Sequence, residues 1–168
     1  FAPDLVHLNG YVHAHLRWRA PLLVVGHSCL VSWWEAVRSG PLPAAWERYR
    51  EAVRTGLRAA DAVVAPSRSM PSALKRHYGI SRGEVIYNGR TGGPFPTAPK
   101  EPFILGAGRL WDEGKNLRLL ASVASSLAWP VRLAGESKGP AGAAWAASGA
   151  ALLGRCSSAQ MAELYRRA

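Results

Sequence analysis

Two cations follow two glycines within one short segment, residues 103–117, which reads Phe-Ile-Leu-Gly-Ala-Gly-Arg-Leu-Trp-Asp-Glu-Gly-Lys-Asn-Leu. The forked guanidinium of Arg109 can bond two phosphate oxygens, and Lys115 adds a point charge. A helix predicted to start at Asn116 would add N–H groups and a dipole that attract phosphate. The segment therefore predicts an anion site built from Gly108, Arg109 and Lys115. The alternative is a plain strand-to-helix connection with solvated charges.

Polar residues and glycines follow the other predicted strands as well. They are Asn9, His27, Ser67 and Asn88 in the first half, and Gly135, Glu136, Gly154 and Arg155 in the second. Ligands of open α/β sheets bind at the carboxyl ends of strands, so these residues are candidates for a binding site. For His27, a site role and a hydrogen-bonded loop role both stay open. His7, inside an apolar run, is interpreted as a core histidine.

Several kinds of chemistry lack support in this sequence. His13 and His15 are two residues apart, so they do not share a helix face as metal ligands at i and i+4 do. There is no His-Glu-x-x-His, Cys-x-x-Cys, Gly-x-Ser-x-Gly or P-loop motif. We therefore expect no metal site and no hydrolase, and we interpret Cys29 and Cys156 as free thiols.

Composition narrows the class of protein. With 168 residues and 48% hydrophobic residues, the chain can form a packed core, and it has no apolar run long enough to span a membrane. The net charge of +10 suggests nucleic acid as a partner, but the arginines are scattered and interleaved with glutamates. We do not expect nucleic-acid binding. Contact of the basic N-terminal half with a membrane surface stays open.

Apolar runs and helical periodicities alternate along the chain. Strands are predicted at 5–8, 22–25, 62–65, 84–87, 103–105, 131–134 and 150–153, and helices at 11–18, 44–60, 69–78, 116–127 and 157–168. Such alternation predicts parallel sheets with right-handed crossovers. We therefore predict an α/β fold with two incomplete Rossmann-like domains, 1–92 and 103–168, joined by a Pro/Gly-rich linker, 93–102. Because two complete domains of this class need roughly 300 residues, we interpret the chain as an interior fragment.

In their order and spacing, these segments resemble the family-4 (group 1) glycosyltransferases of the GT-B fold. The matching segments are Pro3–His7, Val24–Ser28, Ala60–Ser67, Val85–Gly89, Gly108–Leu110, Glu113–Leu117, Leu133–Glu136, Leu153–Gly154 and Glu163–Ala168. Each match is short, and together they are spread over nearly the whole chain.

The resemblance implies a retaining enzyme that moves a hexose-type sugar from a nucleoside-diphosphate donor to a sugar, lipid or small-molecule acceptor. It implies no metal or other cofactor, a role in glycan, glycolipid or glycoconjugate synthesis, and a location in the cytoplasm or at the inner face of the membrane. Residues 1–92 would bind the acceptor and residues 103–168 the donor. Arg109 and Lys115, with Gly108, would hold the diphosphate.

The resemblance assigns roles to the other candidate site residues with less support. Gly135, Glu136, Gly154 and Arg155 would lie near the nucleotide, and Asn9, His13 and His27 are the candidates for catalysis.

Two departures from the family pattern bear on activity. Asn9 stands where the family often has a second histidine, and His13 of the same loop is the candidate substitute. The paired glutamates that grip the donor sugar in the family would lie beyond Ala168, so we expect this chain to be inactive alone. The main alternative is a non-catalytic GT-B-like module that binds nucleotide or polyphosphate. A hexosyl phosphorylase or sucrose-type synthase is a less favoured enzyme.

Overall fold

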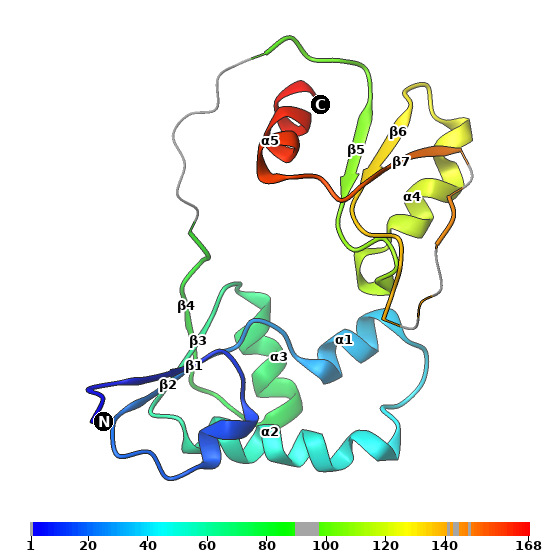
Figure 1. Ribbon diagram of the computed structural model, residues 1–168. Coiled ribbons are helices and arrows are strands. Elements are labelled where there is room, and N and C mark those ends of the chain that lie inside the picture. The colour runs from blue at the N-terminus through cyan, green and yellow to red at the C-terminus, as the bar shows by residue number, and fades with distance from the viewer. Residues whose placement is uncertain (1, 90–97, 141, 143–144, 148) are drawn as a thin grey trace. The chain divides into compact units, whose positions relative to one another are not determined.

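The chain divides into two compact units, Phe1–Arg90 (unit 1) and Thr91–Ala168 (unit 2), as Figure 1 shows. The computed structural model describes residues 2–89, 98–140, 142, 145–147 and 149–168. Each unit contains a parallel sheet, so the predicted α/β fold with two parallel sheets is confirmed. Of the predicted linker, residues 93–97 lie outside the described residues, and residues 98–102 lead into the first strand of unit 2.

Unit 1 alternates strands and helices around a four-stranded sheet of order β1-β2-β3-β4. Its elements are β1 (Val6–Leu8), the 3-10 helix η1 (Val12–His15), β2 (Leu22–Val25), α1 (Leu30–Val37), the 3-10 helix η2 (Ala44–Trp46), α2 (Glu47–Ala59), β3 (Ala62–Ala65), α3 (Ser69–Tyr78) and β4 (Glu84–Val85). All paired strands are parallel. This arrangement brings the carboxyl ends of β1 and β2 to one edge of the sheet.

The core of unit 1 lies between the sheet and its helices. Val24 of β2, Leu57 of α2 and Leu74 of α3 are almost fully buried. The 3-10 helix η1 packs closely on α2, because a Cβ added to Gly56 would lie 2.0 Å from the Tyr11 carbonyl oxygen. Only glycine permits that approach of two backbones.

Local signals predicted the α3 boundaries with partial success. Gly79 ends the helix in the left-handed conformation, with φ of 72°, and its N–H donates to the Lys75 carbonyl at 3.0 Å, as the sequence predicts. The sequence also favours Ser69 as the N-cap, but Ser69 is the first helical residue. Arg68 takes the cap position and contributes no side-chain cap bond.

Two predictions of burial in unit 1 are wrong. His7 is exposed, whereas Val6 and Leu8 on either side of it are half-buried, because successive side chains of a strand point to opposite faces of the sheet. The sequence also predicts that Trp46, Tyr49, Val53 and Leu57 share the core side of the helix expected at 44–60. Val53 and Leu57 of α2 are buried, but Trp46 of η2 and Tyr49 of α2 are exposed. These two rings stack edge to face on each other, with centroids 6.0 Å apart.

Unit 2 has a three-stranded sheet of order β5-β6-β7. Its elements are β5 (Ile104–Ala107), the 3-10 helix η3 (Glu113–Lys115), α4 (Leu117–Val123), the 3-10 helix η4 (Ala124–Ser126), β6 (Val131–Ala134), β7 (Ala150–Gly154) and α5 (Ser158–Arg167). The helix predicted over 116–127 is shorter. Asn116 adopts the left-handed conformation, with φ of 50°, so α4 begins after it and ends at Val123, where η4 continues.

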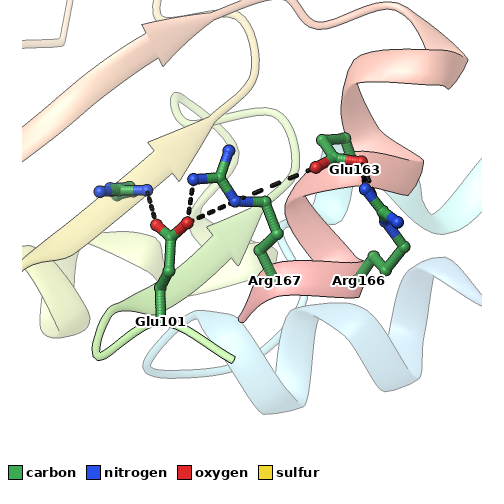
Figure 2. A network of polar contacts seen from close by, with 5 residues as sticks. Glu101, Glu163, Arg166 and Arg167 are labelled. Atoms are coloured by element: carbon green, nitrogen blue, oxygen red, sulfur yellow. Dashed lines mark hydrogen bonds and ion pairs between the residues drawn. The ribbon is translucent and has the colours of Figure 1, made fainter. Parts of the chain in front are cut away.

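Polar contacts, rather than burial, hold α5 in place. None of its residues is buried. The sequence predicts a capping box from Ser157 to Gln160, and the structure contains it: the two side chains each bond the other's backbone N–H. At its other end, the Arg167 guanidinium donates to the Glu101 carboxylate (Figure 2). The Glu101 N–H donates to the Arg167 carbonyl at 2.7 Å. Glu163 pairs with Arg166 at 2.5 Å.

The buried imidazole of His77 predicts a pH-dependent stability for unit 1. Its Nε2 lies 3.4 Å both from Arg76 Nε, which can donate to an Nε2 without a proton, and from Glu35 Oε2, which can accept from an Nε2 that carries one. Burial lowers the pKa of His77; Glu35 opposes this shift, whereas Arg76 and Arg50 reinforce it. Below its ordinary pKa of about 6.5, the unfolded chain therefore binds a proton that the folded chain refuses.

We expect the free energy of unfolding of unit 1 to fall as the pH drops from neutrality toward the lowered pKa. His77→Gln should flatten this slope, whatever its effect on absolute stability. The measurement is urea unfolding at a series of pH values. Equal slopes in the two proteins would contradict the assignment.

Candidate functional site

A pocket of about 530 Å³ lies at the carboxyl ends of the three unit 2 strands. Its lining residues are Ala107, Gly108, Arg109, Ala134, Gly135, Glu136, Arg155, Cys156, Met161 and Tyr165. The segments after β5, β6 and β7 all contribute, and α5 supplies Met161 and Tyr165. Five residues chosen from sequence thus meet in one cavity, and Gly154 immediately precedes Arg155.

At the floor of this pocket, two backbone segments lie so close together that no side chain fits between them. A Cβ on Gly135 would lie 1.7 Å from the Gly108 carbonyl oxygen, and Gly135 has a φ of 145°. The Gly108 N–H donates to the Ala134 carbonyl at 2.9 Å, and the Gly135 N–H to the Gly154 carbonyl at 2.7 Å. Glycine is therefore required at position 135, and the three strand ends are fastened together there.

Arg109 is exposed but held in a defined orientation. Its side chain is 61% exposed, yet Nε and Nη2 donate to Asp112 Oδ2 at 3.1 and 2.5 Å. Its guanidinium carbon lies 5.3 Å from the centroid of the Trp111 ring. The remaining guanidinium N–H groups are left to bond a ligand in the pocket that Arg109 lines.

Asp112 is the neighbour of Arg109 that the sequence interpretation missed. Its side chain is only 12% exposed, and its Oδ1 accepts from the Gly114 N–H at 2.9 Å. The hydrogen bond from Arg109 lowers the pKa of Asp112, and that from Gly114 adds to the effect, so the carboxylate stays ionised. The available signal was an aspartate three residues after the arginine and two before a glycine, as in an Asx turn.

Lys115 lies at the edge of the site rather than among the pocket-lining residues. It belongs to η3, and its aliphatic stem runs beside Gly108, with Cγ 3.5 Å from where a Gly108 Cβ would be. Helix α4, whose N-terminus was expected to attract the anion, starts only at Leu117 and contributes no residue to the pocket. The groups that line this pocket are therefore side chains and strand-end backbone, not the N-terminus of α4.

In unit 1, the structure brings together two of the three candidate catalytic residues. Asn9 and His27 follow β1 and β2, and Asn9 Oδ1 lies 3.1 Å from His27 Nε2. His13 is exposed on η1, and its backbone carbonyl accepts from the Leu16 N–H and the Trp18 indole. Among the described residues, no hydrogen bond joins the His13 side chain to this pair.

The described residues contain neither a candidate metal site nor a candidate membrane-spanning helix. No group of three or more histidine, cysteine, aspartate or glutamate side chains there is arranged to hold a metal ion. No helix in the described part of the chain combines the length and the apolar character needed to cross a membrane.

Comparison with protein families decides the identity. The sequence model of Glycosyltransferase Family 4 matches residues 1–90, which is more than half of the chain. The chain belongs to glycosyltransferase family 4. A comparison with curated proteins finds no match. The matched residues coincide with unit 1, and the two parallel-sheet units fit the Rossmann-like architecture of GT-B glycosyltransferases.

The contact between Gly135 and Gly108 makes a sharp prediction for this glycosyltransferase. Gly135→Ala should push the ends of β5 and β6 apart and lower the free energy of unfolding of unit 2 by about 2 kcal/mol or more, as overpacking does. Gly10→Ala is the control, because nothing lies within 4 Å of a Cβ at that position. Denaturant unfolding measures both variants. If Gly135→Ala were as stable as Gly10→Ala, the backbone around Gly135 and Gly108 would have to be able to move apart at little cost.

Proposed function

We propose that this chain is part of a retaining glycosyltransferase that moves a hexose-type sugar from a nucleoside-diphosphate donor to an acceptor, and that the unit 2 pocket binds the donor. The observation that supports this most is the joining of Arg109, Arg155 and bare glycine backbone in one cavity at the strand ends. Its volume of about 530 Å³ is of the size that small-molecule sites have.

The chemistry of transfer explains why cations are needed there. As the bond between sugar and phosphate breaks, negative charge builds on the leaving nucleoside diphosphate. Arg109, held by Asp112 before the ligand arrives, neutralises that charge without reorganising, and Lys115 adds to it from the edge of the pocket. One preorganised donor of this kind is typically worth about 10²–10³ in rate.

The other pocket residues suit the nucleoside better than the phosphates. The Glu136 carboxylate would repel a diphosphate but can accept a hydrogen bond from a ribose hydroxyl or a base N–H. Met161, Tyr165 and Cys156 offer polarizable and aromatic surface for a flat ring. We place the diphosphate near Arg109 and Gly108, and the nucleoside toward Glu136, Gly154 and Arg155.

Unit 1 is assigned to the acceptor. The Asn9–His27 pair supplies a ring nitrogen whose tautomer and orientation the amide can fix, as a group that abstracts or relays a proton requires. The acceptor is a sugar, a lipid or a small molecule with a free hydroxyl.

A second candidate is a module that binds nucleotide or polyphosphate without transfer. It is favoured by one observation: every residue that lines the pocket belongs to unit 2, so binding there does not require unit 1. Release of labelled sugar from a nucleotide-sugar on adding candidate acceptors separates the two proposals.

The donor assignment is tested by ligand-induced stabilisation. At a nucleoside diphosphate concentration of about 100 times Kd, the free energy of unfolding should rise by about 2.7 kcal/mol, so the melting temperature increases measurably. Arg109→Ala removes charge-assisted hydrogen bonds worth about 1.5–3 kcal/mol, so most of that increase should disappear.

Arg118→Ala is the matched control, because Arg118 is an exposed arginine of the same unit that does not line the pocket. A screen of the common nucleoside diphosphates by differential scanning fluorimetry identifies the base. The same stabilisation in both variants would count against the pocket.

The Arg109–Asp112 pair predicts an unusual response to substitution. Asp112→Asn removes a negative charge beside the ligand but leaves a side-chain acceptor for Arg109, so pyrophosphate should bind several-fold more tightly at low salt. Asp112→Ala also removes the orientation and should bind more weakly than the Asn variant. Isothermal titration calorimetry with pyrophosphate compares the three proteins. An unchanged affinity in both variants would show that the pair does not act on the site.

A further inference from the structure

The loop that follows η1 alternates apolar and cationic side chains and exposes all of them. Its sequence is Leu16-Arg17-Trp18-Arg19. Leu16 is 49% exposed and Trp18 is 40% exposed, and both arginines are exposed. Neither the family assignment nor the proposed donor and acceptor sites give this loop a role.

The outward position of Trp18 is fixed by hydrogen bonding. The indole Nε1 donates to the His13 carbonyl at 3.1 Å, and the Leu16 N–H donates to the same oxygen at 3.2 Å. His13 belongs to η1, and the backbone of Tyr11 just before η1 packs closely against Gly56 of α2. The exposed position of Trp18 is therefore fixed by its hydrogen bond to η1 and by the packing of η1 on α2.

The chain segment that contains this loop has no acidic residue, and Glu47 and Glu51 of α2, which line a hollow together with His15, are paired with arginines of their own helix. Between Leu5 and Trp34 there is no aspartate or glutamate, while the same stretch contains Arg17, Arg19 and four histidines. In the part of the chain that the structure describes, neither arginine forms an ion pair. By contrast, Arg50 and Arg54 of α2 pair with Glu47 and Glu51. Two uncompensated cations beside exposed apolar side chains are complementary to an anionic lipid surface.

We propose that the loop Leu16–Arg19 is a docking surface for an anionic membrane. Trp18 and Leu16 enter the headgroup region, where amphipathic indole rings are favoured, and Arg17 and Arg19 contact anionic headgroups. Nucleic acid fits the loop less well, because Leu16 offers neither a stacking surface nor a hydrogen bond to a base. With two arginines and two apolar side chains, the binding is weak and reversible.

Unit 2 supplies a matched control for exposure alone. Trp129 is 54% exposed, more than Trp18, but its neighbours are Ala128 and Pro130, with no cation within two residues. If exposed tryptophans bound lipid without help from arginine, Trp18 and Trp129 would contribute alike.

The test is co-sedimentation of the whole chain with an excess of phosphatidylcholine vesicles, prepared with and without phosphatidylserine. We expect binding only to the vesicles that contain phosphatidylserine. Arg17→Gln combined with Arg19→Gln should weaken it by about 25-fold, since each arginine near an anionic surface contributes about fivefold. Trp18→Ser should also weaken it, and Trp129→Ser should not.

Three outcomes would overturn the proposal. They are equal binding to both kinds of vesicle, equal loss in the Trp18 and Trp129 variants, and no vesicle binding together with an arginine-dependent affinity for single-stranded oligonucleotides. Thermal unfolding of each variant, monitored by circular dichroism, shows whether a loss of binding comes from the surface rather than from the fold. Nucleoside diphosphate binding should be unchanged in all the loop variants, so this test is independent of the donor site.

Discussion

The close approach of Gly135 to the Gly108 carbonyl is the constraint on which the unit 2 pocket depends. A single added Cβ would lie 1.7 Å from that oxygen, so the ends of β5 and β6 are kept together only while position 135 has no side chain. The Gly135 N–H then reaches the Gly154 carbonyl, which adds the end of β7. Arg109, Glu136 and Arg155 each follow one of these three strand ends. Their convergence is thus a consequence of backbone packing, not of contacts among the three side chains.

Arg109 of unit 2 and the loop arginines of unit 1, Arg17 and Arg19, differ in whether a carboxylate pairs with them. Arg109 is oriented by a carboxylate that also cancels part of its charge, and the low exposure of Asp112 keeps that pair in place. Pairing with Asp112 fixes the orientation of the Arg109 guanidinium and weakens its attraction for distant anions. Such an arrangement would suit a group that stabilises charge at one atom during a reaction. Arg17 and Arg19 have no such partner among the described residues. No carboxylate in that part of the chain offsets their charge or fixes their orientation, which suits attraction to a broad anionic surface.

The parts of this structure that follow from sequence are those that local chemistry decides. The strands at 22–25 and 62–65, the Gly79 stop and the Ser157–Gln160 capping box were predictable because neighbouring residues alone determine them. The convergence of the strand-end residues followed from the general geometry of parallel sheets. The exposure of His7 and of the Trp46 and Tyr49 rings was not predictable, since burial depends on which elements lie nearby. The Asp112 contact required the fold of the turn itself.

The parts of the chain that line the pocket therefore differ in rigidity. Its floor is fixed by backbone hydrogen bonds and by the glycine contact, whereas the α5 wall that carries Met161 and Tyr165 has no buried residue. That helix is held by its capping box and by the Glu101–Arg167 network (Figure 2), and exposed ion pairs contribute only about 0–1 kcal/mol each. Under the proposed donor assignment, the end of the pocket that would bind the diphosphate is the rigid one, as charge stabilisation requires, while the end that would bind the nucleoside can adjust. Specificity for the base would then be set by small movements of α5, and the binding of the diphosphate would be common to every donor.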